Sequence, residues 1–230
     1  MTLHQVLAMC LGLSLAHTAA GAVLLLVAGF ALTAARSAWL MSHARAEVAR
    51  LSVVGTPARV SALAANLWIS RLVCIEGTRP IAFCAGALWP SIFISEGLAT
   101  AMDDAELVAV LLHEQDHVRR REPLRRAVRH AATWGFCYFP LLRWRARNQA
   151  QRSELRADRR ALSRVTPQVL ARSWLRADWG RPTRQTATAF AGTAERRVAQ
   201  LLGDPMLAPR AGRRPWVLSL AGGGGGPGEA

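Results

Sequence analysis

A short run in the middle of this 230-residue chain, His113-Glu114-Gln115-Asp116-His117, carries the side chains best suited to chemistry. Two histidines four residues apart lie on one face of a helix, where both imidazoles can bind one Zn²⁺ ion. Glu114 is close enough to reach a water on that ion but is turned away from direct ligation. We expect Glu114 to accept a proton from the water and pass it to a leaving amine, as peptide hydrolysis requires.

A third metal ligand must come from elsewhere in the chain. A histidine six residues after His117 would complete one class of zinc site, but Pro123 occupies that position. The other arrangement uses a glutamate on a later helix, and Glu154 in the segment SELRAD is the best candidate. Asp158 lies one turn further on the same helix face, where it can accept a hydrogen bond from a ligand imidazole. Without the histidine pair, these two carboxylates would indicate a solvated ion-pair network with nearby arginines.

The hydrophobic pattern predicts the elements that position these residues. The apolar run LVAVLL precedes the first histidine, and Asp103 and Asp104 favour a helix start, so we expect a helix that begins there and stops at Pro123. Further helices are expected over residues 148–165 and 190–203. Three short strands are predicted to form a small antiparallel sheet, at Leu72–Ile75, 81–84 and Ser91–Ser95. The predicted fold class is α+β and mainly α.

An uncharged apolar segment over residues 6–32 is longer than the roughly 20 residues that cross a bilayer. A cleavable signal peptide is the rival interpretation, but the run is long and no basic residue precedes it. Arg36, Arg45 and Arg50 follow the segment. The positive-inside rule therefore predicts an outside N-terminus and a cytoplasmic catalytic domain.

A second apolar segment, residues 127–142, is short and has arginines on both sides. It favours a helix pair that dips into the membrane and breaks at Gly135 or Pro140, with a full crossing as the alternative. Four regions are expected along the chain. They are a transmembrane anchor (1–36), a helical connector (37–70), a metallopeptidase domain (71–205) and a disordered glycine-rich tail (206–230).

Composition narrows the classes of protein. Only 19% of residues are charged, whereas a typical soluble domain has about 25%, so membrane lipid is an expected partner. The net charge is +14, but no aromatic stacking platform accompanies the arginines, and direct nucleic-acid binding is not expected. The four cysteines, Cys10, Cys74, Cys84 and Cys137, form no CxxC pair and favour buried free thiols. Cys74 and Cys84 flank a predicted turn, where they can face each other across a hairpin.

Four segments together resemble the integral-membrane gluzincin metallopeptidases: LWPSIFISEGL, DDAELVAVLLHEQDHVRRREP, FCYFPLLRWRARNQAQRSELRADRRAL and AERRVAQLL. The BlaR/MecR-type sensor-transducer peptidases are the most similar group, and HtpX-like and CAAX prenyl endopeptidases are more distant. The resemblance covers roughly residues 70–203. It implies one zinc per chain on His113, His117 and Glu154, catalysis by Glu114, and a ligand oriented by Asp158.

The same resemblance implies a bacterial inner-membrane protease with a cytoplasmic site and a protein or peptide substrate, such as a transcriptional repressor. Two alternatives stay open: a non-catalytic zinc-binding membrane scaffold or regulator, and a basic membrane adaptor with an accidental motif. Glu114 favours catalysis over the scaffold, because a structural zinc site does not need it. An arginine or His130 is the candidate to stabilise the oxyanion, and Ser91–Ser95 is expected to offer a strand edge to substrate.

Overall fold

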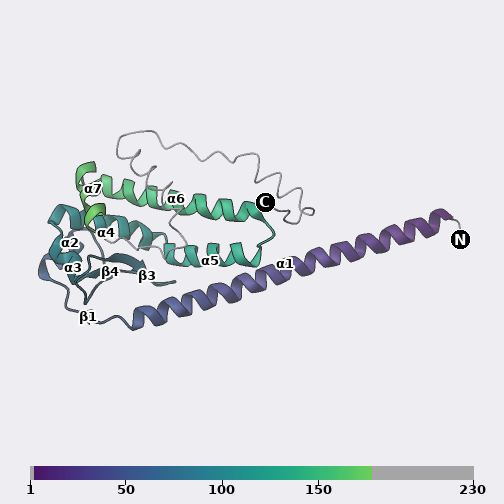
Figure 1. The fold of residues 1–230 in the computed structure, drawn as a ribbon, viewed down its shortest axis with the longest axis horizontal. Coiled ribbons are helices and arrows are strands. Elements are labelled where there is room, and N and C mark those ends of the chain that lie inside the picture. The colour runs from purple at the N-terminus through teal and green to yellow at the C-terminus, as the bar shows by residue number, and fades with distance from the viewer. Residues whose placement is uncertain (1–2, 178–230) are drawn as a thin grey trace, which may run out of the picture.

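The long N-terminal helix projects away from the rest of the molecule (Figure 1). The computed structural model describes residues 3–177, and side chains from residue 16 onward. Helix α1 (Leu3–Ala49) is continuous through residue 36, where the anchor is predicted to end. Within the described residues, Ala16–Ala49 is the one helix long and apolar enough to cross a membrane. The predicted apolar N-terminal helix is therefore confirmed.

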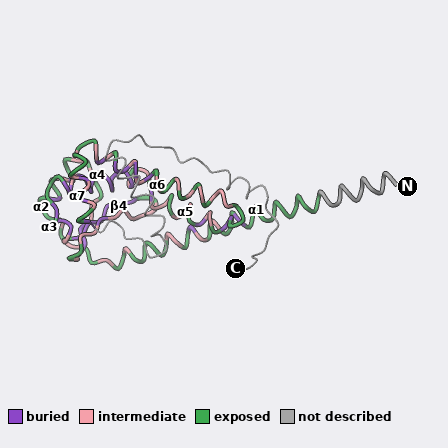
Figure 2. Tube along the Cα trace, turned by 45° about the horizontal axis from the view of Figure 1, so that its top comes forward, coloured by how far each residue is buried: buried purple, intermediate pink, exposed green. Residues whose placement is uncertain are grey.

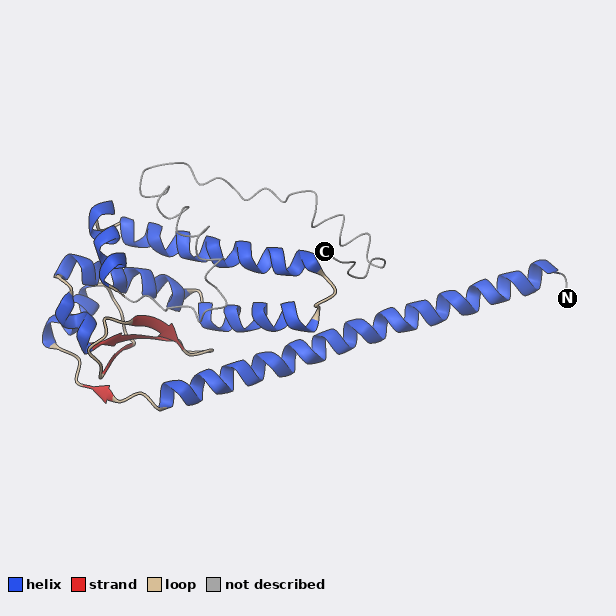
Figure 3. Cartoon of the chain, in the orientation of Figure 1, coloured by secondary structure: helices blue, strands red, loops and turns tan. Residues whose placement is uncertain are grey.

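A four-stranded sheet lies below helix α4 in Figure 3, with strand order β1-β2-β4-β3. The strands are β1 (Val53–Val54), β2 (Leu72–Ile75), β3 (Ala82–Ala85) and β4 (Ser91–Ser95). Strands β2 and β4 pair in parallel, whereas the other two pairs are antiparallel. The three predicted strands are confirmed, but the expectation of a purely antiparallel sheet is wrong.

The central place of β4 explains the mixed sheet. Its Ile92 and Ile94 are almost completely buried, so this strand is most stable where both of its edges are hydrogen-bonded. Along the chain, β3 follows β2 but lies at the edge of the sheet. The next strand, β4, takes the place between β2 and β3. Ser91–Ser95 was expected to offer a strand edge, but it is a central strand. Strand β3 lies at the edge instead. Cys74 and Cys84 are thus separated by β4, and both are free thiols.

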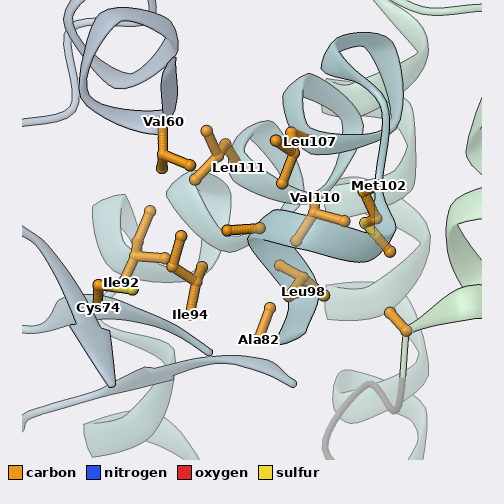
Figure 4. Packing of buried hydrophobic residues seen from close by; sticks show 12 residues of the cluster. Val60, Cys74, Ala82, Ile92, Ile94, Leu98, Met102, Leu107, Val110 and Leu111 are labelled. Carbon is orange, nitrogen blue, oxygen red and sulfur yellow. The ribbon is translucent and has the colours of Figure 1, made fainter. Parts of the chain in front are cut away.

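Helix α4 (Asp104–Arg119) contributes side chains to both clusters of buried apolar residues. Its apolar side chains pack against the sheet and against α2 (Ala58–Asn66) and α3 (Glu96–Ala101), as Figure 4 shows for Leu107, Val110 and Leu111. Figure 2 shows the buried residues gathered around this helix, whereas most of α1 is exposed. A helix that is apolar on nearly all sides is expected to be buried in this way.

The ends of α4 are set by local chemistry. Asp103 and Glu106 form a capping box at the start, which confirms the predicted N-terminus. The helix ends at Arg119, and Arg121 takes a left-handed conformation that turns the chain. We expected Pro123 to stop α4, and this expectation is wrong. Pro123 lies in the first turn of α5, where its missing N–H costs nothing.

Helices α5 (Glu122–Gly135) and α6 (Pro140–Leu162) form an antiparallel pair (Figure 1). The break between Gly135 and Pro140 confirms the predicted helix pair. Helix α5 packs along α1, and α6 packs on α4. Helix α7 (Pro167–Arg176) also packs on α4. The helix expected over 148–165 is the second half of the longer α6. The helix predicted over 190–203 and the glycine-rich tail lie outside the described residues.

Candidate metal centre

Helix α4 brings the two histidines of the motif together. His113 and His117 are both buried, and their rings meet edge to face with centroids 4.8 Å apart. Their Nε2 atoms are 3.1 Å apart. This convergence follows directly from the spacing of four residues on a regular helix.

Helix α6 places a carboxylate opposite this pair. One oxygen of Glu154, Oε2, lies 3.5 Å from His113 Nε2, and the other, Oε1, lies 3.9 Å from His117 Nε2. One possible ligand atom from each of the three residues falls within 4.8 Å of the others. The structure therefore brings together His113, His117 and Glu154, the three residues predicted to hold a metal.

Asp158 is fully buried one turn further along α6. Its Oδ1 lies 3.0 Å from His113 Nδ1. When Nδ1 donates its hydrogen to this carboxylate, the lone pair of Nε2 faces Glu154 and His117. That is the tautomer a metal ligand needs, so the contact is the one predicted for Asp158.

The electrostatics of the site favour a cation. Burial opposes protonation of His113, but hydrogen bonds that its ring donates to the carboxylates of Asp158 and Glu154 outweigh it and raise the pKa of His113 to about 9. Burial, followed by the neighbouring His113, lowers the pKa of His117. The two carboxylates thus favour positive charge at the histidine pair. A divalent cation would be attracted to the same place, with both imidazoles neutral.

Glu114 is buried but lies outside the group of converging ligand atoms in the described chain. Its carboxylate acts on two neighbours: it raises the pKa of His117 against the dominant effect of burial, and it adds to the effect of burial on Cys84 in strand β3. Glu114 is therefore near enough to His117 and to the edge strand β3 for its charge to act on both. This position fits a proton-transfer residue better than a ligand.

Arg126 on α5 is a site residue that the sequence analysis did not single out. Its Nη2 lies 3.5 Å from Glu154 Oε1, and most of its side chain is exposed. It supplies a positive charge at the open side of the site. His130, one turn further along α5, is exposed. The sequence analysis named an arginine or His130 as the residue that stabilises the oxyanion. Of these two candidates, the arginine is the one that contacts a predicted ligand.

The donor set fits a zinc ion. Two imidazole nitrogens and one carboxylate are the ligands of catalytic zinc sites that keep a fourth position for water or substrate. One possible ligand atom from each of the three groups lies close to the others, and Asp158 contacts the His113 ring on its opposite nitrogen, Nδ1. A structural zinc site would instead be expected to have four protein ligands.

A histidine pair and a carboxylate on two packed helices, beside a long apolar helix, are features expected of a membrane-associated metallopeptidase. The family model described as BlaR1 peptidase M56 matches residues 10–198. The chain belongs to this family, which confirms the resemblance to BlaR/MecR-type peptidases and indicates a protease. A comparison with curated proteins gives no match.

Proposed function

We propose that this protein is a zinc-dependent endopeptidase, anchored in the membrane by α1, that hydrolyses peptide bonds on the cytoplasmic side. The observation that carries the proposal is the convergence of His113, His117 and Glu154, with His113 held by Asp158. Membership of the BlaR1 peptidase family supports it. The arginines that follow the apolar segment support the cytoplasmic side.

Each residue has a distinct role in the proposed reaction. His113, His117 and Glu154 hold zinc, which supplies Lewis-acid chemistry and makes water acidic near neutral pH. Glu114 accepts the proton of the attacking water at its carboxylate and then donates it to the leaving amine. Asp158 keeps Nε2 of His113 directed toward the metal. Arg126, at the exposed side of Glu154, is placed to stabilise negative charge on the substrate carbonyl.

The edge strand β3 is proposed to bind the substrate. An extended peptide can add to the free edge of a sheet through main-chain hydrogen bonds. Cys84 in β3 is influenced by the charge of Glu114, so a peptide on this strand would pass close to the proposed base. We propose, on the basis of the family, that the substrate is a protein such as a transcriptional repressor. Membrane lipid is the second proposed partner.

Metal content and turnover of the full chain, purified in detergent, test the proposal together. We expect about one zinc per chain by elemental analysis in the wild type and in Glu114→Gln, and much less in Glu154→Gln. Glu114→Gln should lower the rate of peptide cleavage by about 10² to 10⁴. Unchanged zinc in Glu154→Gln would remove that residue from the ligand set. Zinc without any cleavage of peptides or repressors by the wild type would favour the scaffold.

A further inference from the structure

A pocket of about 550 Å³ opens on the outer side of α6, next to the C-terminal end of α4. It is distinct from the metal centre. Successive residues of an α-helix turn by about 100°, so Arg156 and Arg160 point away from the face that carries Glu154 and Asp158. The lining contains five arginines: Arg119, Arg120, Arg156, Arg159 and Arg160.

The pocket has a large excess of positive charge. Asp116 is its only acidic lining residue, and this carboxylate is already engaged by Arg120, whose Nε lies 3.0 Å from Oδ2. The other four arginines form no ion pair with any residue in the described part of the chain. Guanidinium groups gathered in this way repel one another unless an anion lies between them.

Two of these arginines also have unsatisfied donors. The Nε atoms of Arg156 and Arg160 are shielded from solvent and have no hydrogen-bond partner among the described residues. A buried N–H without an acceptor costs free energy, and native proteins rarely leave one unpaired. A small rotation of each guanidinium onto the oxygens of a bound anion would supply the missing acceptors.

We propose that this arginine pocket binds a phosphate-bearing anion. Phosphate presents several acceptor oxygens and more than one negative charge, so it can accept paired hydrogen bonds from more than one guanidinium fork. Arg120, Arg156 and Arg160 form the base of the pocket, and the exposed Arg119 and Arg159 lie at its rim. The phosphate belongs either to an anionic lipid headgroup or to a soluble compound. The proposal does not depend on the proposed peptidase activity.

Isothermal titration of the full chain with inorganic phosphate at constant ionic strength tests the pocket. We expect saturable binding by the wild type in neutral detergent at phosphate concentrations up to about 10 mM. Loss of two guanidinium groups in the double variant Arg156→Gln with Arg160→Gln should weaken this binding at least about tenfold. The matched control is Arg143→Gln with Arg147→Gln, which removes two exposed arginines at the same spacing on α6 and should bind like the wild type.

Nanodiscs distinguish the two sources of phosphate. If lipid headgroups occupy the pocket, discs that contain phosphatidylglycerol should block the titration, whereas phosphatidylcholine discs should not. Equal binding in both discs would identify a soluble ligand instead. The rim variant Arg119→Gln with Arg159→Gln provides a second test if the first variant does not fold. Absence of saturable binding, or equal weakening by the control variant, would overturn the proposal.

Discussion

The two histidines of α4 are not equivalent at the residue scale. His113 is held through Nδ1 by the buried carboxylate of Asp158. His117 has no such support, because its Nδ1 is buried without a hydrogen-bond partner among the described residues. His113 is therefore oriented through Nδ1 by a carboxylate, whereas His117 meets its polar neighbours through Nε2, which lies 3.1 Å from Nε2 of His113.

Removing the charge of Asp158 should weaken the metal site without deleting a ligand. We expect Asp158→Asn to reduce zinc affinity by about 10- to 100-fold, because the oriented tautomer of His113 loses its stabilising carboxylate. Competition with a fluorescent zinc chelator measures the change. The control is Asp116→Asn, which changes an acid on α4 that pairs with Arg120. Equal affinities for wild type and Asp158→Asn would contradict the positioning role.

The thiol beside Glu114 should be unusually unreactive. Burial, followed by the negative charge of Glu114, raises the pKa of Cys84 to about 12. At pH 8 almost none of this thiol is ionised, so we expect slow alkylation by iodoacetamide in the native protein and faster alkylation as the pH rises. Mass spectrometry can compare Cys84 with the exposed Cys137 and with unfolded protein.

Substitution of the neighbouring acid gives a second readout for the same thiol. Glu114→Gln removes the second-largest cause of the raised pKa and should increase the labelling rate of Cys84. Equal labelling rates of Cys84 in the wild type and in Glu114→Gln would show that the charge of Glu114 does not act on this thiol.

Sequence spacing predicted the proposed ligands because their geometry is local. The histidine pair needs only one helical turn, and Glu154 with Asp158 needs another. Arg126 was not identified, because its approach to Glu154 depends on how α5 packs against α6. No fixed spacing in the sequence encodes that contact.

At the element scale, α5 packs closely against the anchor helix α1. A Cβ atom added at Gly135 would lie 2.5 Å from Thr33 Oγ1 and 2.7 Å from the carbonyl oxygen of Gly29. A Cβ added at Gly29 would in turn meet the ring of Phe136 at 2.5 Å. Small residues thus allow α1 and α5 to approach closely, as glycines do where membrane helices pack.

A larger residue at this crossing should separate the two helices. We expect Gly135→Val to destabilise the protein by about 1–3 kcal/mol, because the backbone of α1 cannot yield to the added methyl groups. Gly21→Val is the matched control, since a Cβ there meets nothing within 4 Å. Thermal unfolding in detergent and the rate of trypsin cleavage measure the effect. Similar stabilities of the two variants would argue against a tight crossing.

The elements themselves were predicted with mixed success, for a physical reason. The three strands, the start of α4 and the break before Pro140 depend on nearby residues, and these predictions were confirmed, whereas α6 begins eight residues before the predicted start at residue 148. Strand order depends on which strand is buried most deeply, and this is decided by contacts with α4 and α3 that no local pattern contains. The mixed sheet and the edge position of β3 therefore emerged only from the structure.

For the whole molecule, the metal should act as a cross-link between α4 and α6. A ligand that binds only the folded protein stabilises it by about 2.7 kcal/mol at 100 times its Kd. We expect a chelator to lower the unfolding midpoint by several degrees, followed through the fluorescence of the eight tryptophans. Glu154→Gln should show no such shift. Identical midpoints with zinc and with chelator would mean that no metal links the two helices.

The length of α1 has a consequence for which bonds can be cut. Helix α1 has 47 residues, and at 1.5 Å per residue this is about 70 Å. The hydrocarbon core of a bilayer is only about 30 Å thick. In the proposed membrane-anchored protease, the excess would make the helix a spacer, and its close contact with α5 would hold the proposed metal centre at a defined distance from the membrane. Such a protease would act as a molecular ruler, selecting cleavage sites in membrane-attached substrates by their distance from the lipid surface.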